Sequence, residues 1–456
     1  MGTHTANEDT RLSRWQRVRE FAVPPTMIET ATARRNAGDW AGACAAAHAD
    51  VDLDLGALTR TWGRDMRDRI RADLRRLAPD LLRWHLPRIA PDGLLRPGLT
   101  MPLARYDAGT HDDAGSRYDA GKGALHLVVR TPPAWADAGQ RISLALWDGA
   151  LGEPAAREHP HPHPSRRFRF DLHRHLWDAG AAGELRTRSG ADRQPDGEPS
   201  LCATGRWADE ARIVLRAEGR DSGTVTVRLG GRQRIALHLA ADGTTSTGRD
   251  TDTGALPVLP DAATWTLPDL ELLRAGLIDA DRLHPLVAAA LVPGYLPSGR
   301  TARPDPAGQA RLVDCRGARH RIGMVDGVLS PLDHSADQLR REELLVALGG
   351  PPLPCLRVID EAHRRPDCLT GVRERLDHGD TAGALAVVEE LLGPEAVLRD
   401  GPLRDELEAA ARRRVAYGLY RAGLAGSRNG PVRARRQRRS RRLRDPRPGP
   451  RPATWR

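Results

Sequence analysis

The sequence predicts an α+β fold in which helical N- and C-terminal domains flank a central antiparallel β sheet or sandwich, followed by a disordered basic C-terminal tail. Three observations predict it. Helix-starting phrases stand near both ends of the chain, apolar residues alternate with a period of two between them, and arginine dominates the last thirty residues. A chain of 456 residues is long enough for several domains with cores of their own.

Two similar segments near the ends of the chain predict helical hairpins. GDWAGACAAA begins at Gly38 and GDTAGALAVV begins at Gly379. In each, the Gly-Asp pair predicts a turn followed by a helix N-cap. Further along, MRDRIRADLRR (66–76) aligns with LRDELEAAARR (403–413). The segments are either related helical units or independent copies of a common phrase in an alanine-rich chain.

Between these segments the apolar pattern changes to the alternation of β-strands. In TVTVRLGGRQRIALHL (224–239) two alternating runs are separated by Gly-Gly, which predicts a hairpin. Other alternating sets are Leu125, Leu127 and Val129; Ile142, Leu144 and Leu146; and Phe168, Phe170 and Leu172. We therefore expect a small antiparallel sheet or sandwich.

A helical segment is expected at 267–293, with Leu270, Leu273 and Leu277 on one face, and a second hairpin in RLVDCRGARHRIGMVDG. The predicted domains are 1–105 (helical), 120–242 (antiparallel β), 262–336 (helical segment plus hairpin), 337–426 (helical) and 427–456 (disordered tail).

The tail carries the net charge of the chain. It holds twelve arginines and one aspartate, whereas the whole chain has a formal net charge of +10, so the preceding residues are close to neutral. Like charges spaced by Pro and Gly cannot bury apolar surface, which predicts disorder. Such a tail neutralises nucleic-acid phosphates without reading their sequence, or binds an acidic protein, or is a passive or artefactual end. The arginines expected to contact a polyanion are Arg433, Arg435, Arg436, Arg438, Arg439, Arg441, Arg442 and Arg444.

Cysteine usage and hydropathy bear on location. The five cysteines are scattered and odd in number, which does not suggest a disulfide framework and favours a reducing cytoplasm. The sequence contains neither an apolar N-terminal segment nor a run of eighteen apolar residues, so no membrane contact is expected.

Histidines gather beside one predicted strand. EHPHPHP (158–164) leads into RRFRFDLHRHLWD, and if the aromatic side chains of this strand point inward, Asp171, His173 and His175 share the opposite face. An H-x-H pair on a strand suits zinc, and Asp171 or a histidine from the proline-spaced run can complete the site. The neighbouring arginines would repel a cation, which instead favours a solvated loop.

A second candidate zinc site lies in the C-terminal half. Four residues separate Cys315 from His320, and four separate His363 from Cys368. These side chains can form a closed Cys₂His₂ structural site, although the short C-x-x-C spacing is absent and buried cysteines also serve as small apolar side chains. The sequence predicts no cofactor, and zinc at one of these two sites is the alternative.

Catalytic motifs are scarce. The sequence contains no G-x-S-x-G elbow and no H-E-x-x-H. Asp333 and His334, in SPLDHSAD, offer the minimum for an acid–base pair. The same loop also provides an Asp or Ser to cap the following helix, LRREELLVALGG, and we favour the cap.

VIDEAH (358–363) resembles the second motif of the DEAH-box helicases, in which the Asp holds Mg²⁺ and the Glu orients water. The resemblance requires a phosphate loop, and the single lysine, Lys122, is not in one. Leu353, Leu356 and Ile359 fall on one helical face, so we interpret the segment as an amphipathic helix with an exposed Asp360–Glu361 pair.

These observations favour a non-enzymatic cytoplasmic interaction or scaffold protein that binds a protein partner. The alternatives are a metal-dependent hydrolase that uses a His/Asp cluster, and a nucleic-acid-associated regulator whose affinity lies in the Arg-rich tail.

Overall fold

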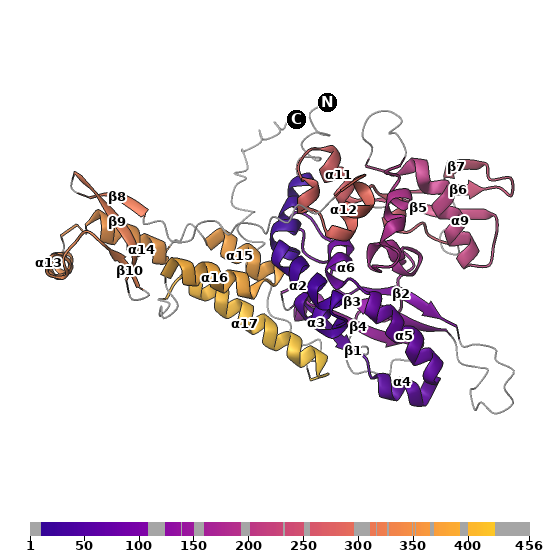
Figure 1. Ribbon diagram of the computed structural model, residues 1–456, viewed down its shortest axis with the longest axis horizontal. Coiled ribbons are helices and arrows are strands. Elements are labelled where there is room, and N and C mark those ends of the chain that lie inside the picture. Colours follow the sequence, from indigo (N-terminus) through magenta and orange to yellow (C-terminus); the bar gives the residue numbers. More distant parts are fainter. Residues whose placement is uncertain are drawn as a thin grey trace, which may run out of the picture.

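The computed structural model shows a chain of mixed helices and strands with three small sheets among the residues that it describes (Figure 1). The described residues are 11–107, 124–137, 139–149, 159–192, 201–230, 233–249, 256–295, 311–315, 317–325, 328–348, 350–351, 353–364, 369–392 and 400–424.

Within these ranges the strands are β1 (Ala49–Asp52), β2 (Thr100–Tyr106), β3 (Leu125–Arg130), β4 (Ile142–Trp147), β5 (Gly223–Gly230), β6 (Gln233–Leu239), β7 (Thr245–Arg249), β8 (Arg311–Cys315), β9 (Ala318–Val325) and β10 (Val328–Pro331). The α-helices are α2 (Pro25–Asn36), α3 (Trp40–Ala46), α4 (Leu55–Trp62), α5 (Arg64–Arg76), α6 (Pro79–His85), α8 (Leu185–Ser189), α9 (Trp207–Ala217), α10 (Asp261–Thr264), α11 (Pro268–Arg274), α12 (Pro285–Leu291), α13 (Ala336–Ala347), α14 (Pro354–Arg364), α15 (Leu369–His378), α16 (Thr381–Leu392) and α17 (Pro402–Arg421). A π-helix, η1, spans Val18–Ala22, and 3₁₀ helices are η2 (Ala134–Ala136), η3 (Phe170–Leu172), η4 (Arg174–Leu176), η5 (Ala182–Glu184), η6 (Thr204–Arg206) and η7 (Ala280–Arg282).

The largest sheet has the strand order β1-β4-β3-β2 and is mixed. β2, β3 and β4 pair antiparallel, whereas β1 runs parallel to β4, with Ala49 opposite Ile142. Helices from the N-terminal part of the chain share its core, which includes the fully buried Trp84 and Trp177. The same core takes in α11 and α12, so it joins segments that are far apart in the sequence.

A second, antiparallel sheet has the order β5-β6-β7 and packs against α9 and α10. Val225 lies opposite Leu237 in the ladder, and both side chains are buried. The hairpin predicted over 224–239 is therefore confirmed, with its apolar residues on the face that meets the helices.

Two C-terminal helices, α15 and α17, contact the N-terminal part of the chain (residues 11–295), which we call the body. Arg83 of α6 is fully buried and donates hydrogen bonds to the backbone oxygens of Gln140 (2.5 Å) and His378 (3.0 Å). Tyr417 of α17 donates its hydroxyl to Asp50 of β1 at 2.7 Å. Because a buried guanidinium costs free energy unless its donors are satisfied, these bonds fix the end of α15 against the body.

The two Gly-Asp segments form the same local structure, as predicted. Gly38 and Gly379 both have positive φ values, 79° and 90°, that favour glycine. The following Asp39 accepts from the backbone N–H of Gly42 at 2.8 Å, and Asp380 accepts from the equivalent N–H at 2.9 Å. Each aspartate also pairs with the arginine five residues earlier. The two turns share one capping geometry.

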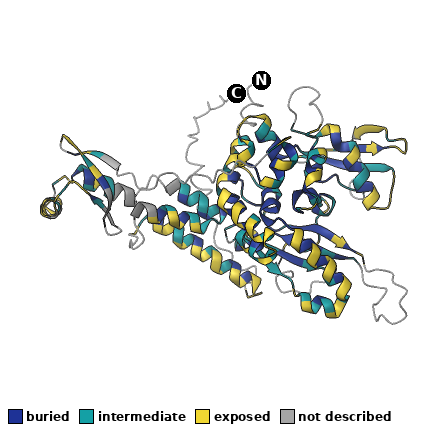
Figure 2. Cartoon of the chain, viewed as in Figure 1, coloured by how far each residue is buried: buried dark blue, intermediate teal, exposed yellow. Residues whose placement is uncertain are grey.

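The third sheet, with the order β10-β9-β8, joins α13 and α14 in what we call the distal module. It stands at the opposite end of the molecule from β5, β6 and β7 (Figure 1). Most buried residues lie in the body, and the distal module has only a small core that includes Ile322, Leu353 and Cys355 (Figure 2). The predicted hairpin of β8 and β9 and the predicted helix over VIDEAH are both present.

The fold class is confirmed at the level of mixed helices and strands with small antiparallel sheets. The finer arrangement differs from the prediction. Strands between 120 and 242 belong to two separate sheets, and the first of these takes β1 and β2 from the range 1–105 that we expected to be helical.

The strand predicted over RRFRFDLHRHLWD (166–178) is wrong, because this segment contains the 3₁₀ helices η3 and η4. Phe170, His173 and Leu176 are all buried, at a spacing of three that matches one 3₁₀ turn. The alternation of Phe with Arg suggested a strand, but Arg169 bonds with Asp171, two residues away. Local pairing of this kind satisfies a charged side chain without a sheet.

The helix predicted over 267–293 is broken into α11, η7 and α12. Gly276, with φ of 64°, lets the backbone turn back so that Leu277 N–H bonds to Leu272 O. Leu270 is buried as expected, whereas Leu277 lies beyond the helix and is exposed.

The C-terminal tail and the eight arginines expected to bind a polyanion lie outside the described residues. Among the described helices, none is long and apolar enough to cross a bilayer.

Candidate metal centre

Two thiols and two imidazoles meet in the distal module. One ligand atom from each of Cys315, His320, His334 and Cys355 lies within 4.8 Å of every other. Both cysteines are buried and both histidines are half-buried. This donor set, two sulfurs and two nitrogens, is the one that structural zinc sites use.

The β8–β9 hairpin positions the first two side chains. Cys315 is the last residue of β8. His320 of β9 lies opposite Val313, which precedes Cys315 by two residues. Since residues opposite one another share a face of an antiparallel pair, and so do residues two apart, the hairpin places Cys315 and His320 on the same face as diagonal neighbours.

The other two side chains come from the end of β10 and the start of α14. β10 pairs with β9 as far as Pro331, and Leu332 N–H bonds to Arg321 O at 2.8 Å, so the chain enters the following turn beside His320. His334 lies in that turn. Cys355 is the second residue of α14, which packs its apolar side chains on the sheet.

The distances fit a metal-binding pocket. His334 Nε2 lies 2.7 Å from His320 Nδ1 and 3.7 Å from Cys315 Sγ. Tetrahedral Zn²⁺, with bonds of about 2.0 Å to nitrogen and about 2.3 Å to sulfur, places its ligand atoms about 3.3–3.8 Å apart. The imidazoles therefore need to separate by only about half an ångström to coordinate an ion.

The thiols meet in an apolar environment. Burial, and then the neighbouring thiol of Cys315, raise the pKa of Cys355 to about 11. Such a thiol is protonated at neutral pH, whereas Zn²⁺ binds the thiolate. Metal binding at this centre would thus release protons.

The structure brings together half of the predicted Cys₂His₂ set. Cys315 and His320 meet, but with His334 and Cys355 instead of His363 and Cys368. The His363 side chain and the whole of Cys368 lie outside the described residues. The prediction rested on equal spacing within two pairs, whereas the third and fourth ligands are separated by the whole of α13.

The predicted acid–base pair is divided between two networks. Arg321 donates its backbone and side-chain N–H groups to Asp333 and lowers the pKa of this carboxyl to about 2. His334 instead faces His320 and Cys315. Ser335 caps α13 in a capping box with Gln338, as we expected of this loop.

The first predicted zinc ligands are placed differently from the prediction. Asp171 accepts hydrogen bonds from Arg169. His173 Nδ1 bonds with Arg169 O at 2.8 Å, and its Nε2 lies 3.1 Å from a carboxylate oxygen of Glu210. The His175 ring packs edge-on against that of His173, and both are buried. These side chains stabilise the body and do not share an open face.

Comparison with protein-family models, curated proteins and solved structures finds no match to this chain.

Proposed function

We propose that this protein is a non-enzymatic interaction protein whose distal module is held in shape by a structural Zn²⁺ and presents α13 to a protein partner. The observation that supports the proposal is the convergence of Cys315, His320, His334 and Cys355 within 4.8 Å. The distal module has a small core, and a bound metal commonly provides the folding free energy that such a core lacks.

Four protein ligands favour a structural role over a catalytic one. A catalytic zinc keeps one coordination position for water or substrate, whereas a Cys₂His₂ set closes the coordination shell. The metal-dependent hydrolase is therefore the weaker candidate. The nucleic-acid-associated regulator depends on the tail, outside the described residues.

α13 is the surface that the metal would present. It begins two residues after His334 and ends eight residues before Cys355, so both of its ends are tied to the centre. Its last turn and the residue that follows it expose apolar side chains: Leu344 is 61% exposed and Leu348, just after the helix, is 85% exposed, with Leu345 and Val346 also exposed. Contiguous exposed apolar residues are typical of an interaction site. A groove that accepts an amphipathic helix is the partner surface that suits α13.

The test compares partner capture by three forms of the full chain in the native cell. The double variant Leu344→Asp and Leu348→Asp places charge on the α13 surface. Val415→Asp is the matched control, since Val415 is 64% exposed on α17. We expect a stoichiometric protein to be retained by the wild type and Val415→Asp and lost with the α13 variant. The same proteins recovered with all three forms would contradict the proposal.

The cytoplasmic location expected from the cysteines stays a prediction. Reduced thiols are required for zinc coordination, and a reducing compartment would supply them.

A further inference from the structure

A cavity of ≈ 360 Å³ lies in the body, far from the distal module in sequence. Its walls come from residues 11–15, the end of α6 with the residues after it, the η3–η4 segment, and the residues between α10 and α11. A second cavity, of ≈ 450 Å³, adjoins it and shares Arg96, Arg167 and Phe168. Single cavities of this size accommodate small organic ligands.

Arginine dominates the first cavity. Among the described residues that line it, six are arginines and Asp261 alone carries a carboxylate. Three of the arginines are neutralised by ion pairs: Arg11 with Glu271, Arg167 with Asp261 and Arg169 with Asp171. For the other three, Arg14, Arg88 and Arg96, no ion pair with a carboxylate is present in the described part of the chain. The cavity therefore holds surplus positive charge.

Several buried donors in the cavity wall lack partners. Arg88 donates hydrogen bonds from Nη1 to the backbone oxygen of Gly93 (2.8 Å) and from Nη2 to that of Arg83 (2.7 Å). Its buried Nε has no hydrogen-bond partner in the described residues. The buried Nε of Arg14 and Nε1 of Trp15 likewise have no hydrogen-bond partner in the described residues. Unpaired buried donors cost free energy, and a bound acceptor would remove that cost.

The His85 ring adds a neutral polar group. Its side chain is 2% exposed, and Nε2 lies 3.8 Å from the nearest carboxylate oxygen, of Asp269, beyond hydrogen-bond distance. Burial lowers the pKa of His85 to about 4, so the ring is neutral at pH 7 and can donate or accept one hydrogen bond.

Aromatic rings complete the walls. The guanidinium of Arg14 lies over Trp15, 5.5 Å from the ring centroid, and that of Arg167 lies over Phe168 at 5.1 Å. Trp265 also lines the cavity. A surface of this kind suits a planar ring, while arginine forks match the oxygens of a phosphate.

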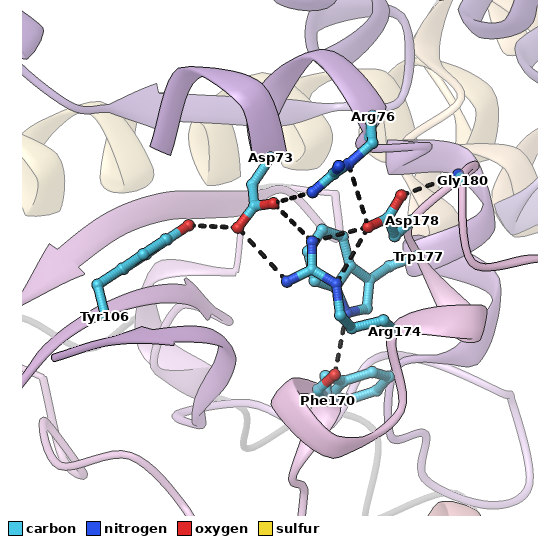
Figure 3. Close-up of polar contacts among 8 residues, drawn as sticks. All are labelled: Asp73, Arg76, Tyr106, Phe170, Arg174, Trp177, Asp178 and Gly180. Carbon is cyan, nitrogen blue, oxygen red and sulfur yellow. Dashed lines mark hydrogen bonds and ion pairs between the residues drawn. The ribbon is translucent and has the colours of Figure 1, made fainter. Parts of the chain in front are cut away.

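A polar network holds the wall formed by η3 and η4 in place. Arg174 bridges Asp73 of α5 (2.5 Å) and Asp178 (2.7 Å), and Trp177 Nε1–H donates to Phe170 O at 3.0 Å (Figure 3). Tyr106 of β2 donates its hydroxyl to Asp73 at 2.6 Å. The cavity is thus preformed on the main core, which lowers the entropy cost of binding.

We propose that this cavity binds a nucleotide-sized phosphate ester, with its phosphate between Arg14, Arg88 and Arg96 and its planar ring against the aromatic wall. The binding site is independent of the proposed metal centre and of the proposed interaction through α13.

The experiment is isothermal titration of the purified full chain with AMP, adenosine and inorganic phosphate at low salt. Arg14→Gln and Arg96→Gln remove one charge each from the cavity. The matched control is Arg75→Gln, an exposed arginine of α5 that does not line the cavity. Far-ultraviolet circular dichroism and thermal melts establish that each variant is folded, and Arg96, which is exposed, is the safer substitution.

We expect AMP to bind more tightly than adenosine or inorganic phosphate. Because each substitution removes a hydrogen bond to a charged group, Arg14→Gln and Arg96→Gln should each bind AMP about tenfold more weakly or worse. The affinity of Arg75→Gln for AMP should equal that of the wild type. The inference is overturned if AMP gives no binding at millimolar concentration, if the cavity variants bind like the wild type, or if phosphate binds as tightly as AMP.

Discussion

Replacing Asp73 by Asn should destabilise the body by about 3 kcal/mol at pH 7. Asp73 is 5% exposed and accepts hydrogen bonds from Tyr106 (2.6 Å), Arg174 (2.5 Å) and Arg76 (2.6 Å) (Figure 3). Hydrogen bonds to charged groups contribute about 1.5–3 kcal/mol each. The Arg76 side chain is half exposed, so its bond contributes little to stability. Arg174 keeps its ion pair with Asp178 in the variant. The expected loss of unfolding free energy is therefore that of about two weakened hydrogen bonds and is smaller than the loss of all three.

Local hydrogen exchange is the appropriate assay, since a chain with several cores need not unfold in two states. A loss of about 3 kcal/mol accelerates exchange by roughly 100-fold, and we expect this in peptides from α5 and β2. The control is Asp68→Asn on the same helix, because Asp68 is exposed and pairs only with the neighbouring Arg67 among described side chains. We expect Asp68→Asn to exchange like the wild type.

The pH dependence provides the sign test. Burial alone would raise the pKa of Asp73, but the hydrogen bonds from Arg174 and Tyr106 outweigh it and lower the pKa below its usual value of about 3.9. The stabilisation is therefore complete above the unfolded-state pKa and is lost as pH falls through the folded-state pKa. The difference in unfolding free energy between the wild type and Asp73→Asn should therefore become smaller as the pH is lowered. A difference below about 0.5 kcal/mol, or one that grows in acid, would refute the reasoning.

Three further predictions follow from other parts of the chain. Ser335→Ala removes the cap of α13 and should cost about 1 kcal/mol, seen as faster hydrogen exchange confined to that helix; unchanged exchange would contradict the capping role. Burial raises the pKa of Cys44 to about 12, so iodoacetamide at pH 7.5 should leave Cys44 unmodified in the native protein and alkylate it after denaturation, and equal rates in both states would disprove its burial. Deletion of 427–456 should weaken binding to single-stranded DNA and flatten its dependence on salt in an electrophoretic shift series, and unchanged binding would rule out the tail as the source of affinity.

Local sequence signals predicted local structure well. The Gly-Asp turns, the Ser335 cap and the hairpin over 224–239 were predictable because each depends on residues a few positions apart. The same holds for the VIDEAH helix, whose apolar spacing is helical along its whole length. In these cases the chemistry that stabilises the element lies within the element itself.

Signals that depend on distant residues were not predictable. His173 and Asp171 were expected on an open strand face, but Glu210 and Arg169 engage them, and nothing near 171–175 identifies Glu210 as a partner. Cys355 meets Cys315 only because α14 packs on the sheet. The sequence signal for the candidate centre was the co-occurrence of Cys and His in the distal module, without a spacing rule to choose among them.

The arginine-lined cavity shows the same limit more strongly. Arg14, Arg88 and Arg96 come from different segments of the chain, so no local sequence pattern groups them. An arginine-rich composition does not distinguish them from the exposed arginines of α5. What distinguishes them is that they line one cavity and form no ion pair with a described carboxylate, and both properties depend on how the chain packs.

Zinc content tests the central claim most directly. Elemental analysis of the purified full chain should find about one Zn²⁺ per chain in the wild type and in Cys202→Ser, whose sulfur lies outside the candidate centre, and none in Cys355→Ser. Wild-type protein without stoichiometric zinc, or Cys355→Ser with as much zinc as the wild type, would contradict the proposed metal centre.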